Sequence, residues 1–245
     1  MIDERLVKAE MKRLFKRLLA VLVLLAVVVV GALAWRGWRL YRTAFAQMPL
    51  QQLVQQRRAA ADYTPLEQLP QMYLDAVVAV EDHRFYKHHG VDPIAIGRAI
   101  VVDLATLSFA EGGSTLTQQL AKNLYFTHAK TLDRKVAEVF AAWELEKALT
   151  KQEILELYAN SVYFGSGCYS IGSASQRYFG CAPAALNDAQ CVMLAGLPKA
   201  PSVYDPSDGE HRLALQRQKQ VLRRMVDTGV LTGQQADEIA AQPVF

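Results

Sequence analysis

The sequence contains few of the patterns that identify common functional classes. Its three cysteines, Cys168, Cys181 and Cys191, have no metal-ligand spacing; two of them could pair outside the cytoplasm, but unpaired thiols are the simpler interpretation. There is no phosphate loop of the nucleotide-binding type and no Gly-x-Ser-x-Gly elbow. The net charge of +3 is small, and no basic stripe interleaved with aromatics is present. These absences leave no sign of zinc, nucleotide or nucleic-acid binding.

Alternating strand patterns and internal repeats are absent as well, whereas helix-start signals recur from residue 71 onward. We therefore expect a compact all-α domain. Helices are predicted over 72–82, 93–109 and 210–228, near 173–178, and after the caps Thr115, Asp133, Thr150, Asn187 and Thr232, with Gly229 ending the 210–228 helix. The helix over 93–109 is unusually apolar; we expect it in the core, with contact to the membrane face as the alternative.

The amino-terminal segment has the composition of a membrane anchor. Basic residues between 5 and 17 precede an uninterrupted apolar run from Leu18 to Trp35, which is about long enough to cross a bilayer core and predicts a cytoplasmic amino terminus. A cleaved signal peptide is the alternative, because Ala44-Phe45-Ala46 is cleavage-like, but it lies far from the run. We expect a cytoplasmic basic tail (1–17), a transmembrane anchor (18–35), a tether (36–70) and the helical domain (71–245).

Three stretches carry groups suited to chemistry. On the Thr115 helix one face combines Gln118, Gln119 and Lys122, amides and a cation that suit a sugar or an anion, although a solvated face has the same pattern. At 81–82, adjacent carboxylates follow an apolar run, where partial burial suits a general base; a polar helix end is the alternative. In 133–138, Arg134 and Glu138 lie one turn apart, either as a surface ion pair or, with Lys122 and Lys135, as a clamp for a diphosphate. The buried face of that last helix is predicted as Val136, Val139, Phe140 and Trp143.

These stretches form an ordered set of motifs. They are Glu81-Asp82-x-x-Phe85-x-x-His88-x-Gly90, Gly113-Ser114-Thr115-Leu116-Thr117-Gln118-Gln119-Leu120-x-Lys122-Asn123, Arg134-Lys135-x-x-Glu138, Lys151-x-Glu153-Ile154-Leu155-Glu156-Leu157-Tyr158-x-Asn160 and Leu194-Ala195-Gly196-Leu197-Pro198-x-Ala200-Pro201. From about Asp75 to Pro206 the chain resembles the peptidoglycan glycosyltransferases of family 51, with the motifs in family order. Ser170, where glycine is usual, and Ala159, where a larger apolar residue is common, depart from the pattern outside the expected catalytic positions.

The resemblance implies a lysozyme-like α-helical domain that polymerises lipid II into glycan strands. In that family the acceptor's 4-hydroxyl attacks the anomeric carbon of the growing chain and displaces undecaprenyl diphosphate with inversion. Glu81 is then expected as the general base and Glu138 as the catalytic residue at the donor side, with a divalent cation (Mg or Mn) as its candidate partner and no organic cofactor. Expected substrate-binding residues are Asp82, Phe85, His88, Gly113, Ser114, Thr115, Gln118, Gln119, Lys122, Asn123, Arg134 and Lys135.

The resemblance also implies partners and a location. Lipid II, the lipid-linked glycan chain and the membrane are expected partners, together with cell-wall synthesis proteins; a single-pass protein of the bacterial inner membrane with a periplasmic domain is expected. No serine is followed three residues later by lysine, so the transpeptidase nucleophile motif is missing and a monofunctional enzyme is expected. A lysozyme-like hydrolase and a catalytically idle membrane scaffold are the alternatives; the cations and the anchor favour transfer.

Overall fold

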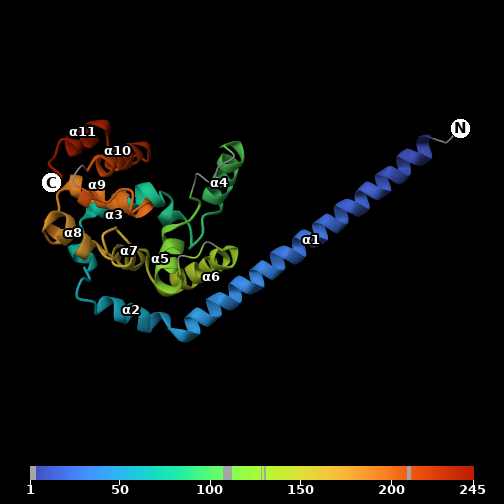
Figure 1. Ribbon diagram of the computed structural model, residues 1–245, viewed down its shortest axis with the longest axis horizontal. Coiled ribbons are helices and arrows are strands. Elements are labelled where there is room, and N and C mark those ends of the chain that lie inside the picture. Colours follow the sequence, from blue (N-terminus) through green and yellow to red (C-terminus); the bar gives the residue numbers. More distant parts are fainter. Residues whose placement is uncertain (1–3, 107–111, 128, 130, 209–210) are drawn as a thin grey trace.

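The computed structural model describes residues 4–106, 112–127, 129, 131–208 and 211–245, and within these ranges it consists of helices without β-strands, which confirms the all-α class (Figure 1). The α-helices are α1 Glu4–Gln47, α2 Leu50–Arg58, α3 Gln71–Glu81, α4 Pro93–Thr106, α5 Leu116–Tyr125, α6 Leu132–Ala148, α7 Lys151–Ala159, α8 Ile171–Phe179, α9 Asp188–Gly196, α10 Arg212–Asp227 and α11 Gly233–Ala240. Short 3₁₀ turns connect several of them, among them Leu66–Gln68.

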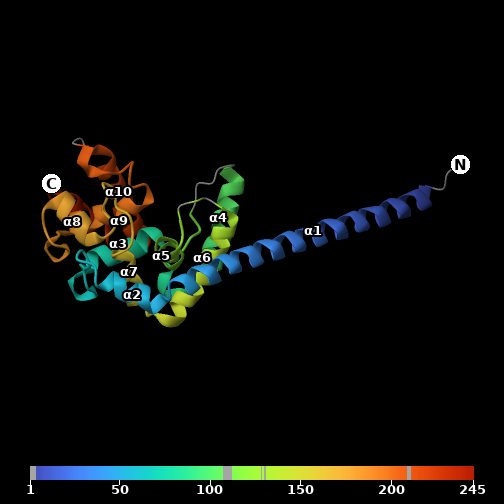
Figure 2. The ribbon, with the colours of Figure 1, turned by 60° about the horizontal axis from the view of Figure 1, so that its bottom comes forward.

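Helix α1 projects far beyond the body of the molecule, in both ribbon views (Figures 1 and 2). Its most apolar window has a mean hydropathy of 3.0, and none of that window is buried. By length and composition this helix is able to cross a membrane, and it fits a single-pass anchor near the amino terminus.

The carboxyl-terminal part of α1 is docked on α6. Gly37 is buried there, and a Cβ atom at this position would lie 2.5 Å from Cγ1 of Val136, so a larger residue would force the two helices apart. Arg36 forms an ion pair of 2.7 Å with Asp133, and the ring of Tyr41 stacks on Phe140. The end of the anchor helix is therefore packed against the domain.

The segment 36–70, which the sequence indicates is a tether, is largely helical. It contains the end of α1, all of α2 and the 3₁₀ turn Leu66–Gln68. Arg58 of α2 lies 3.3 Å from Glu153 and 3.4 Å from Glu156 on α7, and the side chain of Asn160 bonds the backbone of Thr64 in both directions at 2.8 Å. These contacts hold the segment on the domain surface.

The core lies where α3, α5, α7 and α9 meet. Tyr73, Phe85, Leu116, Leu120 and Tyr158 have no exposed surface there. Burying a large apolar side chain contributes about 1.5–3 kcal/mol. This packing fixes the ends of α3 and α5, which carry much of the chemistry described below.

Most helix starts agree with the sequence. Thr115, Thr150, Asn187 and Thr232 are each the N-cap of a capping box, and Gly229 has a φ of 75° just after α10, as predicted. The ends predicted near residues 109 and 210 lie outside the described residues.

One predicted start is wrong: helix α6 is capped by Thr131, while Asp133 instead pairs with Arg36 on α1. The short helix predicted near 173–178 is confirmed as α8, which begins at Ile171 because Ser170 accepts the backbone N–H of Ser173 as its N-cap; the serine also donates to Asp62 at 2.5 Å. The departure at Ser170 thus has a structural use.

Two predictions about burial are also wrong. Within α6 the apolar residues without exposed surface are Ala137, Ala141, Ala142 and Leu145, whereas Trp143 is 45% exposed. Helix α6 packs against two helices, α5 and α1, and its larger residues Val136 and Phe140 lie against α1. Residue spacing alone does not reveal the contact with α1. On α4, Ile94 is 62% and Val101 66% exposed, so these residues do not belong to the core.

Candidate active site

Glu81, the last residue of α3, is held by an amide that is itself oriented. Nε2 of Gln119 on α5 donates to Oε2 of Glu81 at 2.8 Å, and the hydroxyl of Tyr158 donates to Oε1 of Gln119 at 3.3 Å. Complete burial raises the pKa of Tyr158 well above its usual value, so the phenol keeps its proton and can act as a donor. The tyrosine thereby fixes which end of the Gln119 amide faces Glu81.

Arg217 of α10 also approaches Glu81. Its Nη2 atom lies 4.0 Å from Oε1 of Glu81, and its Nε donates to the carbonyl of Gly196 at 3.1 Å. The guanidinium side chain is only 9% exposed and the Glu81 side chain 12% exposed. The guanidinium therefore lies at the edge of ion-pair distance from the carboxylate, in a largely buried setting. The motif search missed Arg217, because it lies on α10, beyond the last motif.

Asp82, the neighbouring carboxylate, faces the interior. Nε2 of His88 donates to its Oδ2 at 2.9 Å, and the backbone N–H of Leu116 donates to the same oxygen at 3.0 Å. The carboxylate therefore caps the start of α5, where an acid is favourable. Of the two adjacent acids, Glu81 is turned toward Gln119 and Arg217, whereas Asp82 is turned toward His88 and the start of α5.

Several predicted ligand residues are buried and position the start of α5. Thr115 and Gln118 form the capping box, and the Thr115 hydroxyl donates to the carbonyl of Gly90 at 2.6 Å. Phe85 has no exposed surface and lies under the ammonium of Lys151, 4.3 Å from its ring centre. Direct contact of these side chains with a substrate stays a prediction; their contacts in the structure are with the protein.

Beside Glu81 lies a cationic pocket of about 210 Å³. Glu138 at its base is 2% exposed; it accepts from Nη1 of Arg134 at 2.6 Å and from Nζ of Lys135 at 2.9 Å. The hydroxyl of Ser114 accepts a further bond from Lys135. The three cations line one pocket, and the Arg134–Glu138 ion pair is buried rather than on the surface; that the cations clamp a diphosphate stays a prediction. The pocket is lined by Ser114, Gln119, Lys122, Arg134, Lys135 and Glu138.

Lys122 keeps binding capacity in this pocket. Among the described residues its ammonium has no hydrogen-bond partner, and Nε of Arg134 has none either. Burial lowers the pKa of Lys122, helped by the nearby Arg134 and Lys135, while Glu138 and Glu81 act in the opposite direction. An anion in the pocket would relieve this cation repulsion. Gln119 lines the same pocket and bonds Glu81, so it joins the carboxylate and the cations in one site.

The described side chains do not fit a resident divalent cation. Both oxygens of Glu138 accept hydrogen bonds from cations, and no group of three or more candidate metal ligands occurs among the described residues. Mg²⁺ is usually bound through carboxylates together with other oxygen ligands, and this pocket supplies a single carboxylate, which is already paired with two cations. The expected metal partner of Glu138 therefore finds no support in the donor set.

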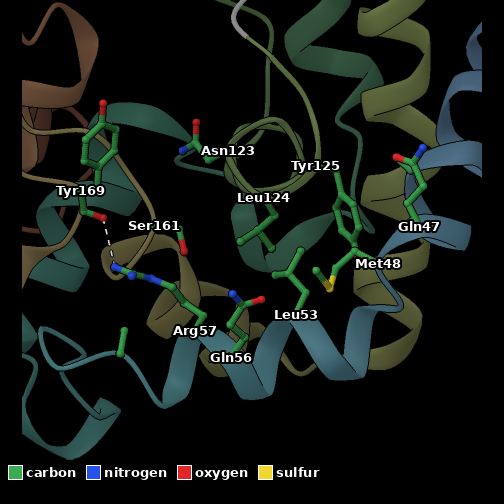
Figure 3. Close-up of a pocket in the computed structure, with 12 residues that line it drawn as sticks. Gln47, Met48, Leu53, Gln56, Arg57, Asn123, Leu124, Tyr125, Ser161 and Tyr169 are labelled. Carbon is green, nitrogen blue, oxygen red and sulfur yellow. Dashed lines mark hydrogen bonds between the residues drawn. The ribbon is translucent and has the colours of Figure 1, made fainter.

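Asn123 and Gly113 do not line the cationic pocket. Asn123 lines a different cavity, beside the junction of α1 and α2 (Figure 3). Gly113 packs on α4, where an added Cβ atom would lie 3.3 Å from that of Ala99. The motif 113–123 therefore contains residues that line the cationic pocket, a residue that lines a second cavity (Asn123) and a residue that packs on α4 (Gly113).

Comparison with known proteins identifies the chain's relatives. A family model described as transglycosylase matches residues 46–226. A protein of Cupriavidus necator, named as a predicted transglycosylase, is 42% identical over 96% of this chain and 99% of its own length. Penicillin-binding protein 1A of Escherichia coli is 45% identical over 73% of this chain, and that of Aquifex aeolicus 42% over 74%. The chain spans only 21% and 25% of the lengths of these two relatives.

A solved structure, penicillin-binding protein 1A of Haemophilus influenzae, is also similar. It matches with a TM-score of 0.44 and 23% identity, covering 74% of this chain and 17% of that one.

Proposed function

Because the chain belongs to the transglycosylase family, we propose that it is a peptidoglycan glycosyltransferase that polymerises lipid II into glycan strands. The observation that carries this proposal is the link through Gln119. One amide side chain bonds the carboxylate of Glu81 and lines the pocket of Lys122, Arg134 and Lys135. A proton acceptor thus stands next to an anion site, as transfer from a diphosphate donor requires.

In the proposed reaction Glu81 acts on the acceptor. Its carboxylate takes the proton of the acceptor's 4-hydroxyl while that oxygen forms a bond to the anomeric carbon of the growing chain. The bond from this carbon to the diphosphate oxygen breaks, its electron pair leaves with undecaprenyl diphosphate, and the anomeric configuration inverts. Gln119 and Arg217 keep the carboxylate oriented before the proton moves.

The cationic pocket acts on the leaving group. Charge builds on the diphosphate as the glycosidic oxygen departs, and preorganised cations stabilise such charge strongly in a site with little water. Lys122 contributes an ammonium that carries no protein hydrogen bond among the described residues. Glu138 holds Arg134 and Lys135 in place through its two oxygens, which gives this second carboxylate a positioning role at the donor side.

Hydrolysis of a glycan is a poorer match for these groups. Glycosidases generally use two carboxyl groups that flank the scissile bond. Here Asp82 is turned inward onto His88 and Leu116, and Glu138 is paired with two cations. One carboxylate beside three cations supports transfer from a diphosphate.

The membrane would bring the enzyme and its substrates together. We propose that α1 crosses the inner membrane once, with the basic amino terminus in the cytoplasm and the domain on the periplasmic side. Both substrates are then lipid-linked partners in the same bilayer. The exposed Ile94 and Val101 on α4 favour contact of that helix with the membrane surface. Within the given sequence no Ser-x-x-Lys occurs, which supports a monofunctional enzyme.

The test is polymerisation by the purified full chain in vesicles that contain lipid II. We expect glycan strands and a matching release of undecaprenyl diphosphate, without added divalent cation as an obligatory component. Appearance of shortened glycan from preformed strands, with no new polymer from lipid II, would show a hydrolase instead.

A further inference from the structure

A second cavity lies at the junction of α1 and α2 and is larger than the cationic pocket. This elbow pocket has a volume of about 550 Å³, within the range of ~300–1,000 Å³ typical of ligand sites. Figure 3 shows its walls, which come from α1, α2, the end of α5 and the loop after α7. Its lining includes Gln47, Leu53, Gln56, Asn123, Ser161 and Tyr169.

The polar groups of the elbow pocket are neutral. Gln47, Gln56 and Asn123 bring amides from three different helices. Arg57 is the one charged residue of its described lining, and this guanidinium is already occupied: it donates to the carbonyls of Asn160 and, at 3.3 Å, Tyr169. Amides both donate and accept hydrogen bonds without charge, which matches hydroxyl and N-acetyl groups better than phosphate or carboxylate.

Part of the remaining wall suits the apolar face of a sugar. Leu53 and Leu124 line one side, while Tyr169 lies at the other, with its backbone carbonyl toward Arg57 and its ring 57% exposed beside Tyr163 (Figure 3). The hydroxyl of Ser161 is buried and has no hydrogen-bond partner within the described part of the chain. Apolar surface combined with a few polar groups is the usual composition of a site for a neutral organic ligand.

The elbow pocket is one helical turn from the proposed catalytic residues. Asn123 follows Lys122 directly and lies four positions after Gln119, the residue that bonds Glu81. One turn of α-helix advances about 5.4 Å, so a polymer that passes along α5 reaches both places. Resting on the proposed function, we propose that the elbow pocket binds the uncharged, N-acetylated sugar backbone of the strand that the enzyme extends.

The direct test is binding of chitotetraose, a defined N-acetylated glycan, to the full chain in detergent. Gln56→Ala removes one amide of the pocket, and Gln55→Ala is its matched control, since both glutamines are exposed on α2 and Gln55 does not line the pocket. Loss of one hydrogen bond should weaken binding about fivefold in Gln56→Ala, and Tyr169→Ala should weaken it at least as much. Gln55→Ala should bind like the wild type.

A parallel variant separates the two cavities. Lys122→Ala changes the cationic pocket and should leave chitotetraose affinity unchanged. If Lys122→Ala loses affinity for chitotetraose and Gln56→Ala does not, the probe binds at the cationic pocket, which would overturn the proposal. So would a wild-type chain that does not bind the probe. Binding of a cell-wall stem peptide that depends on Gln56, with no such dependence for the glycan, would assign a different occupant.

Polymer length distinguishes this inference from the proposed function. In the lipid II assay Gln56→Ala should start strands at the wild-type rate. It should release shorter products, because the variant holds the strand more weakly and the strand dissociates sooner. If the wild type polymerises and Gln56→Ala gives the same lengths and the same probe affinity, the elbow site is wrong and the enzyme assignment survives. If the wild type makes no polymer but binds the probe through Gln56, the site survives and the assignment does not.

Discussion

Two adjacent carboxylates, Glu81 and Asp82, have opposite surroundings in this protein. Glu81 meets an amide and a guanidinium at the proposed site, whereas Asp82 is enclosed by His88 and the backbone of Leu116. The sequence indicates an acid at this helix end but cannot say which one faces the site. The side-chain direction is decided by the turn that ends α3 at Glu81, with Asp82 in a non-helical conformation (φ −156°, ψ 71°).

This difference predicts that substitutions at the two acids change the free energy of unfolding by different amounts. Asp82→Ala leaves two buried donors unpaired, so the free energy of unfolding should fall by about 2–3 kcal/mol. Glu81→Gln keeps size and hydrogen-bonding capacity and should change it by less than about 1 kcal/mol. Thermal unfolding of the detergent-solubilised chain checks both. Equal losses in the two variants would contradict the assignment of Asp82 as a structural acid.

Lys122 predicts an unusual dependence on alkaline pH. Burial lowers the pKa of Lys122, so its charge is present below that lowered value and is lost, as pH rises, earlier than from an ordinary lysine. Binding of a donor analogue should therefore weaken in the alkaline range below the usual lysine pKa of about 10.4. Lys122→Arg should abolish this alkaline loss, and Lys122→Ala should bind about 10–100-fold more weakly at neutral pH. An identical alkaline profile in Lys122→Arg would assign the loss to another group.

Helix α6 connects the anchor to the anion site. Its residues Arg134, Lys135 and Glu138 form the cationic pocket, while Asp133 and Val136 contact Arg36 and Gly37 of α1. The pocket therefore sits beside the outer end of the proposed membrane span. A lipid-linked diphosphate would lie at this level of the bilayer.

Gly37→Leu tests this docking. A side chain at Gly37 collides with Val136 and should displace α1 from α6, lowering the rate on lipid II in vesicles by about tenfold or more, since small misplacements in an active site are costly. Gly31→Leu is the matched control, because a Cβ atom there meets nothing within 4 Å. Rates on lipid II in vesicles for both variants, with thermal unfolding to confirm folding, decide it. A normal rate in Gly37→Leu would mean that docking does not position the site.

The helices show how far local sequence patterns reach. The capping boxes at Thr115, Thr150, Asn187 and Thr232 were predictable because all of their hydrogen bonds lie within four residues. The start of α6 was not, because Asp133 is drawn to Arg36, about a hundred residues earlier in the chain. Likewise, because α1 packs on α6, the buried face of α6 differs from the face predicted from residue spacing. Long-range partners decide what local spacing leaves open.

At the scale of the whole molecule, the site combines motif residues with one residue outside them. The family pattern predicted Glu81, Gln119 and the cations, and the structure brings them together. Arg217 comes from α10, whose sequence looks like an ordinary amphipathic helix. Its approach to Glu81 depends on how α10 packs on α3 and α9, which no local signal records.

The architecture predicts a particular response to inhibitors. The given sequence has no Ser-x-x-Lys, so the chain should neither be labelled by a fluorescent penicillin nor be inhibited by it. Moenomycin-type mimics of the lipid-linked donor should instead block polymerisation, and Lys122→Ala should weaken that block. Gel fluorescence after penicillin treatment and inhibition curves on lipid II provide the measurements. Covalent penicillin labelling would contradict the proposed architecture.

The central claim is that Glu81 is the proton acceptor for glycosyl transfer. The most direct measurement is the initial rate of lipid II polymerisation by Glu81→Gln, beside Glu238→Gln on the exposed face of α11 as control, with donor-analogue binding measured on both. We predict that Glu81→Gln lowers the rate by about 10²–10⁴-fold while the analogue binds within about twofold of the wild type, and that Glu238→Gln changes neither. A Glu81→Gln enzyme that polymerises at nearly the wild-type rate would contradict the account.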